Sequence, residues 1–373
     1  MKPITSKLVV DDWVEVRGKE EILRTLDSEG RLDGMPFMPE MLAFCGKRFR
    51  VYKRAHKTCD TVFPVRGRRV DRAVHLETRC DGSAHDGCQA GCSIFWKEAW
   101  LKRVNEKPSS VVSKTADVSR KDGEVAPASQ CPESTVWARA RSSESTNGAP
   151  KYSCQATELP YATSRLEWWD VRQYVEDYVS GNVSIWQLIS GGAYFLFHAL
   201  SQAGIGLGRP IRWCWDRFYP LWRGAPFPRR TGTIPRGQPT PATPLNLQPG
   251  DLVRIKPYKD ILNTLDVRNK NRGLFFDAEE VPYCGGAHRV IKRVTKIINE
   301  RTGQMTEMKS PSVILDSVIC QSRYSECRLF CPRSIYALWR EVWLERVRPD
   351  SSDAPGENAD RAVEQRQPAS SGR

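Results

Sequence analysis

The stretch FCGKRFRVYKR (residues 44–54) recurs without a gap as YCGGAHRVIKR (residues 283–293), so that each matched residue stands 239 positions farther along the chain. Farther along, WKEAWLKRV (residues 96–104) recurs as WREVWLERV (residues 339–347). Long matches that keep nearly the same spacing are the sequence signature of a repeated structural unit. The 373-residue chain is therefore predicted to contain an internal duplication.

The repeated segments have the residue pattern of small β-rich modules. Apolar and polar residues alternate in VDDWVEVR (residues 10–17) and in RFRVYKRA (residues 48–55), as they do in half-buried strands. The corresponding strands of the second copy are predicted at residues 249–256 and 288–298, and short helices are predicted at residues 20–27 and 259–266. These patterns predict an α+β fold that is mainly β.

The second copy begins Gly250-Asp251-Leu252-Val253-Arg254-Ile255, which resembles the first strand of small SH3-like or KOW-type β-barrels. The resemblance covers the start of this strand in each copy. It implies that each module is a small SH3-like barrel. The rest of the chain suggests no family.

Changes in composition divide the chain further. Residues 105–150 are rich in Ser, Ala, Thr, Lys and Glu, and too few large apolar side chains are present to offset the entropy cost of ordering. A Pro-rich stretch is expected to form an extended spacer. The predicted order is module A at 8–104, a disordered linker at 105–150, a Trp-rich helical segment at 152–223, a Pro-rich linker at 224–246, module B at 247–347 and a disordered tail at 348–373.

Eight of the twelve cysteines form four pairs that match between the two modules. Four thiolates suffice to close a tetrahedral zinc site or to hold one iron–sulfur cluster. Each module is therefore predicted to bind one metal centre. The predicted ligands are Cys45, Cys80, Cys88 and Cys92 in module A, and Cys284, Cys320, Cys327 and Cys331 in module B. The remaining cysteines, Cys59, Cys131, Cys154 and Cys214, have no counterpart.

The identity of the two metal centres stays open between two Zn²⁺ ions and two iron–sulfur clusters. We prefer zinc, because a closed four-thiolate site that stabilises a small β module is the commoner use of such ligands. Buried unreactive thiols and, in an exported protein, disulfides are the alternatives. His85 is not expected to be a shared ligand, because module B has Tyr324 and Ser325 in the corresponding loop. The spacing after Cys88 and after Cys327 predicts an amphipathic helix or a helix-to-strand transition.

Residues 183–208 are largely apolar, with Trp and Tyr near the borders and arginines after them. This arrangement is typical of a helix at a membrane interface. Polar residues such as Gln187 and His198 interrupt the run, and a span would place two equal thiol sites in different redox compartments. We therefore expect 183–223 to lie on a membrane or to dock on a partner, with an ordinary core helix as the alternative.

The net charge of +13 favours anionic partners. Lys53-Arg54 recurs as Lys292-Arg293, which predicts a basic edge on each module. Such an edge can bind nucleic acid or another anionic polymer. Alternatively, its charges keep an exposed strand from aggregating. The N-terminus MKPITSKLVVDDWVEVR lacks the apolar run of a secretory signal. We expect a cytoplasmic protein, with contact to the inner face of a membrane as an addition.

No Gly-rich phosphate loop, nucleophile elbow or H-E-x-x-H motif is present in the sequence. A site closed by four thiolates favours a structural or electron-transfer role over hydrolysis. The sequence therefore predicts a non-catalytic accessory or scaffold protein whose two metal-stabilised modules bind a protein or anionic partner. An iron–sulfur oxidoreductase or electron-transfer subunit and a nucleic-acid-binding protein are the alternatives.

Overall fold

The structure, a computed structural model, describes residues 7–62, 66–104, 131–142, 149–202, 208–219, 225–325 and 327–347. The chain forms two compact units. Both contain helices and antiparallel strands, which confirms the predicted α+β class. The first unit comprises Met1–Pro228, Val294–Lys309 and Ile319–Tyr336, and the second comprises Arg229–Arg293, Ser310–Val318 and Ala337–Arg373.

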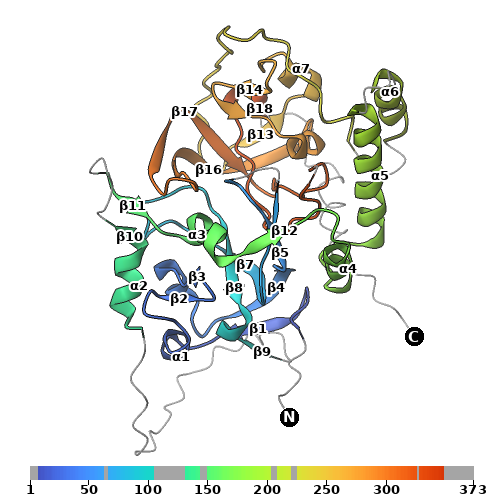
Figure 1. Ribbon diagram of the computed structural model, residues 1–373. Coiled ribbons are helices and arrows are strands. Elements are labelled where there is room, and N and C mark those ends of the chain that lie inside the picture. Colours follow the sequence, from blue (N-terminus) through green and yellow to red (C-terminus); the bar gives the residue numbers. More distant parts are fainter. Residues whose placement is uncertain are drawn as a thin grey trace, which may run out of the picture. The chain divides into compact units, whose positions relative to one another are not determined.

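A five-stranded antiparallel sheet organises the first unit, with the order β8-β7-β4-β1-β9 (Figure 1). The first two strands predicted from the alternating pattern are confirmed. Helix α1 (Lys19–Leu23) confirms the short helix, and the Glu21 carboxylate accepts a hydrogen bond from the backbone N–H of Gly18 at its start. The strands are β1 (Trp13–Val16), β4 (Arg48–Arg54), β7 (Ala73–Arg79), β8 (Ser93–Lys97) and β9 (Leu101–Arg103).

Smaller elements complete this unit. Strands β5 (Lys57–Cys59), β6 (Gly67–Arg69) and β12 (Ser164–Leu166) form a sheet of order β12-β6-β5. Two short hairpins, β2–β3 and β10–β11, lie at Arg31–Leu32 with Met35–Pro36 and at Arg141–Ser142 with Lys151–Tyr152. The short helices are η1 (Pro39–Phe44), η2 (Glu98–Trp100), α2 (Glu133–Ala140) and α3 (Gln155–Ala162).

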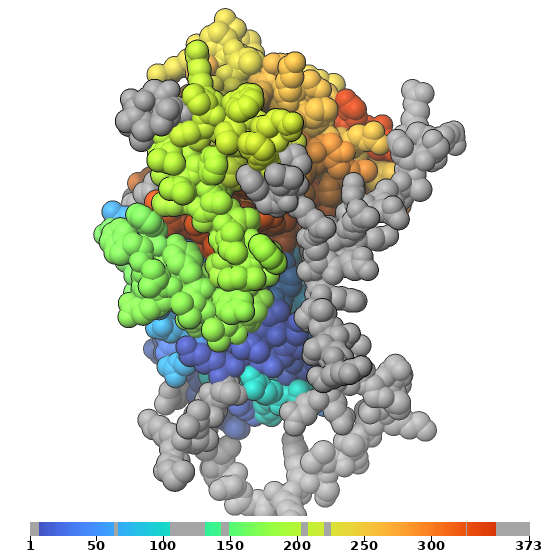
Figure 2. Space-filling view, turned by 90° about the vertical axis from the view of Figure 1, so that its right-hand side faces the viewer, coloured from blue at the N-terminus to red at the C-terminus, as the bar shows by residue number. Residues whose placement is uncertain are grey.

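The Trp-rich segment is helical. It forms α4 (Arg172–Val179), α5 (Ile185–Gln202) and α6 (Gly208–Phe218). Figure 2 shows the outer surface of α5 and α6 in yellow-green on the side that faces the viewer. Within the described ranges, no helix is both long and apolar enough to cross a bilayer.

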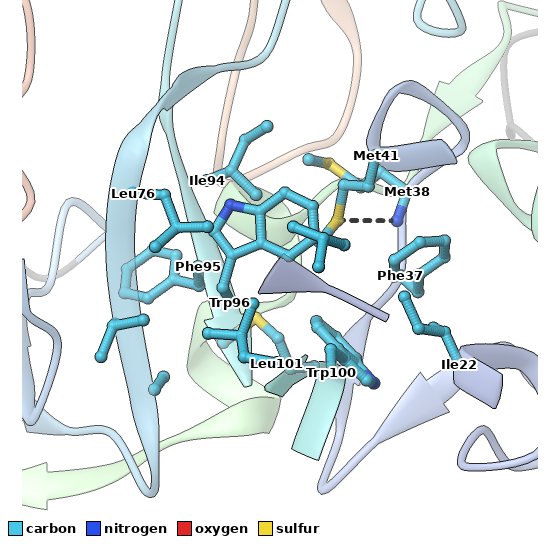
Figure 3. Close-up of a cluster of buried hydrophobic side chains, with 14 of the residues drawn as sticks. Ile22, Phe37, Met38, Met41, Leu76, Ile94, Phe95, Trp96, Trp100 and Leu101 are labelled. Atoms are coloured by element: carbon cyan, nitrogen blue, oxygen red, sulfur yellow. Dashed lines mark hydrogen bonds between the residues drawn. The ribbon is translucent and has the colours of Figure 1, made fainter. Parts of the chain in front are cut away.

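The core of the first unit lies between the five-stranded sheet and the elements that cover it. Trp96 and Trp100 are fully buried there, and Phe37 packs edge-on against Trp100 with a centroid distance of 5.3 Å (Figure 3). Met41 of η1 and Met38, which directly precedes this helix, close the core on the side of the loop that leaves β3. Burial of several such large side chains is the main favourable term in folding.

The second unit is built around a sheet of order β17-β16-β13-β18. The strands predicted at 249–256 and 288–298 and the helix predicted at 259–266 are confirmed. The elements are β13 (Leu252–Ile255), α7 (Tyr258–Leu262), β14 (Lys270–Asn271), β15 (Leu274–Phe275), η4 (Ala278–Tyr283), β16 (Ala287–Ile298), β17 (Met305–Leu315), η5 (Glu341–Trp343) and β18 (Leu344–Arg346). Residues 294–298 of β16 and 305–309 of β17 belong to the first unit.

Strand pairing has the same register in the two units. Val14 of β1 lies opposite Phe49 of β4. Val253 of β13 lies opposite His288 of β16, and both of these residues are 239 positions farther along the chain.

A buried indole hydrogen bond also occurs in both units. The Trp100 Nε1–H donates to the Thr25 hydroxyl at 3.1 Å, and the Trp343 Nε1–H donates to the Thr264 hydroxyl at 2.9 Å. Each threonine lies just after the short helix that follows the first strand. In each unit this hydrogen bond therefore joins the tryptophan near the C-terminal end of the repeated segment to the threonine near its N-terminal end.

The prediction of helix after Cys88 and after Cys327 was wrong. Residues 80–92 form a loop between β7 and β8, and residues 327–340 form turns and short bridges before η5. Gly82, Gly87 and Gly91 adopt positive φ angles in the first loop, which an α-helix does not accommodate.

Two predicted linkers contain ordered structure. Helix α2 lies inside the range 105–150, and its Val136 side chain is buried. In the Pro-rich range 224–246, the Thr233 N–H donates to the Leu262 carbonyl oxygen at 3.2 Å, which joins this segment to the end of α7. The predicted tail, 348–373, lies outside the described residues, and the predicted module boundaries stay predictions.

We expect Trp100→Phe to destabilise the first unit by about 1–2 kcal/mol, because the ring stays buried while the Thr25 hydroxyl loses its donor. Urea unfolding followed by circular dichroism measures this change. Trp186→Phe is the matched control, since Trp186 is 76% exposed and its removal should leave the transition unchanged. Equal midpoints for the two variants would contradict the expectation.

The buried His75 should make the protein less stable in acid. Burial lowers the pKa of His75 to about 4, and its Nδ1–H donates to the Ile94 carbonyl oxygen at 2.9 Å. Because the unfolded chain binds this proton near pH 6.5 and the folded protein does not, stability falls as pH decreases from 6.5 to 4.

His75→Asn keeps a hydrogen-bond donor and removes the titrating ring. Between pH 6.5 and pH 4 the free energy of unfolding of this variant should therefore fall by about 3 kcal/mol less than that of the parent. Urea unfolding at pH 7, 5.5 and 4 measures both slopes. His56, whose pKa is also lowered to about 4 by burial, contributes equally to parent and variant. Parallel slopes would show that His75 does not carry the effect.

Candidate metal centre

The loop that joins β7 to β8 brings two thiols together. Cys80 and Cys92 stand at its two ends, and the Cys80 N–H donates to the Cys92 carbonyl oxygen at 2.9 Å. Gly82 allows the loop to fold back on itself, because a Cβ at this position would lie 2.1 Å from the Cys88 carbonyl oxygen. The tight fold turns Cys88 back toward the base of the loop.

Four cysteines line one small cavity in the first unit. They are Cys80, Cys88, Cys92 and Cys154, and the cavity has a volume of about 40 Å³. A single buried water needs about 10–15 Å³ on a comparable measure, so the space exceeds one water molecule. Other lining residues include Met38, His85, Phe95, Gln155, Ile298 and Arg333.

Backbone N–H groups point at the thiols of this cavity. The Ile298 N–H donates to Cys88 Sγ at 3.4 Å, and the Gly82 N–H donates to the sulfur of Cys80. Cys154 Sγ accepts from two backbone N–H groups in the first turn of α3, which begins immediately after it. Hydrogen bonds of this kind favour a thiolate over a thiol and adjust the potential of sulfur-bound metal clusters.

Positive charge lies beside the thiols. Arg333 lines the cavity with a side chain that is about 1% exposed, and its Nη2 pairs with Glu300 Oε1 at 2.8 Å. The Arg79 guanidinium stacks on the Tyr336 ring at 3.8 Å and donates to the Gly91 carbonyl oxygen at 2.9 Å. A buried guanidinium stabilises negative charge, and four thiolates around a metal carry such charge.

Burial favours the protonated thiol at Cys80, Cys92 and Cys154 when no metal is bound. It raises the pKa of Cys92 to about 11 and that of Cys154 to about 12, and it also raises the pKa of Cys80. Metal binding therefore has to displace protons from neutral thiols. The donor set fits a soft transition metal or an iron–sulfur cluster.

Glu40, Cys80 and His85 form a second, more compact group at the edge of the cavity. Glu40 Oε1 lies 2.6 Å from His85 Nδ1 and 3.8 Å from Cys80 Sγ. In the described part of the chain, no other trio of His, Cys, Asp or Glu has its ligand atoms within 4.8 Å of one another. This trio is therefore a candidate site for one metal ion.

Glu40 and His85 also interact electrostatically. Burial opposes protonation of His85, but the hydrogen bond and the charge of Glu40 outweigh it and raise the pKa of the imidazole. His85 Nε2 lies 3.1 Å from the Ser153 carbonyl oxygen, while the buried Glu40 Oε2 has no hydrogen-bond partner. A buried carboxylate oxygen without a partner is costly unless another group binds it.

The structure brings together some of the predicted ligands and separates others. Cys80, Cys88 and Cys92 line the cavity, and Cys45 does not. The charges acting on the Cys45 thiol come instead from Glu20, Lys19 and Glu133. In module B, Cys320, Cys327 and Cys331 belong to the first unit, whereas Cys284 belongs to the second.

Cys45 and Cys284 occupy equivalent turns. Cys45 has φ −54° and ψ 134°, Gly46 follows with φ 74°, and the Lys47 N–H donates to the Phe44 carbonyl oxygen at 3.1 Å. This is a type II β-turn, and Cys284-Gly285 repeats it with φ −59° and 85°. Turn geometry therefore accounts for the Cys-Gly pair without a metal, and the ligand role of both cysteines stays a prediction.

Sequence reasoning missed two thiols that the structure places beside predicted ligands. Cys154 completes the cavity, and Cys59 contacts Cys331, whose Sγ accepts from the Cys59 N–H at 3.0 Å. The hydrogen bond from the Cys59 thiol lowers the pKa of Cys331 to about 7 against the effect of burial. Neither cysteine has a counterpart in the other module, so the repeat could not reveal them.

The chain matches no protein-family model, and no curated protein is significantly similar to it. Function must therefore be inferred from the site itself.

We expect Gly82→Ala to disorder the thiol loop, because the new Cβ would overlap the Cys88 carbonyl group and the φ of 75° is unfavourable for alanine. The variant should hold at least about tenfold less thiolate-bound metal, an affinity loss of about 1.4 kcal/mol or more. Metal titration of the anaerobic protein measures this. Gly192→Ala is the control, since a Cβ there meets nothing within 4 Å.

Proposed function

We propose that the chain is an electron-transfer protein whose first unit holds an iron–sulfur cluster on Cys80, Cys88, Cys92 and Cys154. The observation that carries this proposal is the convergence of four half-buried cysteines on one cavity beside the buried guanidinium of Arg333. Such a cluster would supply one-electron redox chemistry when bound. The thiols would hold it, and Arg333 would offset its negative charge.

The spacing of the sulfurs favours a cluster over a single zinc ion. Thiolates around tetrahedral zinc lie about 2.3 Å from the metal, which puts the sulfurs about 3.8 Å apart. In the described residues, no three of the cavity thiols have all their sulfurs within 4.8 Å of one another. In a four-iron cluster each thiolate binds a different iron, so the sulfurs stand farther apart.

The Glu40–His85 pair has a separate role in this proposal. It contacts the cavity through Cys80, whose sulfur lies 3.8 Å from Glu40 Oε1. His85 can hold a proton there, because Glu40 raises its pKa. The pair would thus adjust the charge next to the centre without acting as a ligand.

We also infer that the two repeated segments descend from one SH3-like module. The equal strand registers and the equal indole hydrogen bonds support this history. On this proposal the second copy kept the fold-forming turn at Cys284, which lies between η4 and β16 with the same backbone geometry as the turn at Cys45.

Metal analysis of anaerobically purified or iron- and sulfide-reconstituted full-length protein tests the proposal. We expect at least about four iron and four acid-labile sulfide per chain, with a broad visible absorption that bleaches on reduction. Cys88→Ser should remove about four of each. Cys45→Ser should keep the full iron and sulfide content. The ligand set predicted from the repeat, which includes Cys45, would instead require Cys45→Ser to lose iron and sulfide.

Zinc without sulfide would overturn the electron-transfer proposal and return the protein to the scaffold function expected from its sequence. Loss of the spectrum in Cys45→Ser, with Cys88→Ser unaffected, would overturn the ligand set. His85→Gln separates the compact trio from the four-thiol cavity. It should leave the iron content unchanged and shift the reduction potential.

A second candidate function rests on the exposed apolar face of α4, α5 and α6. We propose that this face rests on an anionic lipid surface. Trp186 is 76% exposed and Trp213 is 68% exposed, and the exposed Arg209 and Arg217 lie on the same helix as Trp213. Exposed Trp beside Arg is typical of helices that lie in a membrane interface. Other exposed large apolar side chains of these three helices are Val175, Tyr178, Val179, Ile185, Ile189, Leu196, Leu200 and Phe218.

Trp186→Glu should weaken binding to vesicles of equimolar phosphatidylglycerol and phosphatidylcholine at least about tenfold, because a charge replaces the exposed ring at the interface. Co-sedimentation measures the bound fraction. Trp137→Glu is the matched control, since Trp137 is 52% exposed on α2, away from this face. Equal binding by parent and both variants would exclude the face as the lipid contact.

A further inference from the structure

A second group of cysteines lies elsewhere in the first unit. Cys59 ends strand β5, and its backbone N–H donates to Cys331 Sγ at 3.0 Å. A parallel contact lies two residues earlier, where Lys57 Nζ donates to the Leu329 carbonyl oxygen at 2.8 Å. These two bonds hold residues 329–331 alongside β5, although 272 positions separate each pair in the sequence.

The backbone of Cys327 lies next to the same pair of strands. Gly67 of β6 lies directly opposite Cys59 in the sheet register. A Cβ on Gly67 would lie 3.9 Å from the Cys327 carbonyl oxygen. Cys327 is therefore next to the position that faces Cys59.

Cys320 approaches through a closed turn. Its sulfur lies 3.4 Å from the Ser322 hydroxyl oxygen, and the Phe330 N–H donates to the Ser322 carbonyl oxygen at 2.8 Å. Phe330 precedes Cys331 in the chain. The turn thus returns the chain from Cys320 to Cys331.

We propose that Cys59, Cys320, Cys327 and Cys331 form a second thiolate metal centre, separate from the cavity of Cys80, Cys88, Cys92 and Cys154. Cys331 Sγ accepts hydrogen bonds from the backbone N–H groups of Cys59 and Arg333, which is the environment of a metal-bound thiolate. Cys59 and Cys331 are both buried and Cys320 and Cys327 are half-exposed, so the first two thiols are the ones shielded from solvent.

Arg333 lies between the two groups of thiols. It lines the first cavity, and its charge acts on Cys92 of the first group and on Cys59 of the second. One buried guanidinium thus serves two sites that both concentrate negative charge when loaded. A transfer of electrons between the two centres rests on the proposed electron-transfer function. The proposal that the second group of cysteines binds metal does not.

The ligand set differs from the one predicted by the repeat in a single member. Cys59 takes the place of Cys284, which belongs to the other unit and occupies a type II turn. Similarly, Cys154 takes the place of Cys45 in the first centre. Each centre therefore combines three thiols of a repeated segment with one thiol that the repeat lacks.

The test compares the metal content of full-length Cys59→Ala and Cys327→Ala with the parent after anaerobic reconstitution with ferrous iron, zinc and sulfide. Both variants should lose one centre, about half of the bound metal if the two centres are of equal kind. Cys88→Ala should lose the other half, and Cys59→Ala with Cys88→Ala should lose nearly all. Cys131→Ala, which empties a fully buried cysteine position elsewhere in the same unit, controls for loss of folding.

The proposal is overturned if Cys59→Ala and Cys327→Ala keep the parent's metal content. It is equally overturned if mass spectrometry of the anaerobic native protein finds a Cys59–Cys331 disulfide. Near-ultraviolet circular dichroism confirms that each variant is folded, and Cys327 supplies a half-exposed alternative should Cys59→Ala unfold. Loss in Cys59→Ala with no loss in Cys88→Ala would uphold the second centre and reject the first.

Discussion

The buried charge of Arg333 is the constraint around which the thiol-bearing part of the first unit is arranged. A guanidinium that is about 1% exposed must find compensating negative charge, and Glu300 provides one such partner at 2.8 Å. Both residues come from chain segments that follow the Pro-rich stretch. The first unit is thus completed by chain segments that come after the Pro-rich stretch, and Arg333 beside its thiols is part of this late contribution.

The sequence predicted the sheet well because its signals are local. Alternation in residues 10–17 and 48–55 reflects one buried and one exposed face, and it depends only on neighbouring residues. The loop from Cys80 to Cys92 was predicted less well. A spacing of four between Cys88 and Cys92 suits a helix, but glycines with positive φ at 82, 87 and 91 impose a loop that no periodicity can reveal.

The candidate site could be predicted only in part, for a related reason. Repetition marks residues that keep a fold as readily as residues that bind a ligand, and Cys45 is explained by a type II turn as fully as by a metal. Cys154 and Cys59 stand beside the recurring thiols through tertiary contacts with α3 and β5. Contacts between segments so distant leave no pattern in a single sequence.

The pairing of Cys59 with Cys331 has a consequence for the biosynthesis of the protein. After the ribosome has added Cys59 to the chain, it adds 272 further residues before it reaches Cys331, the contact partner of Cys59. During that time the early sheet can fold, while Cys59 and its neighbour Lys57 remain open to solvent and to other thiols. The order of synthesis therefore leaves the Cys59 thiol in need of protection, by a chaperone or by a reducing environment, until Cys331 has been made.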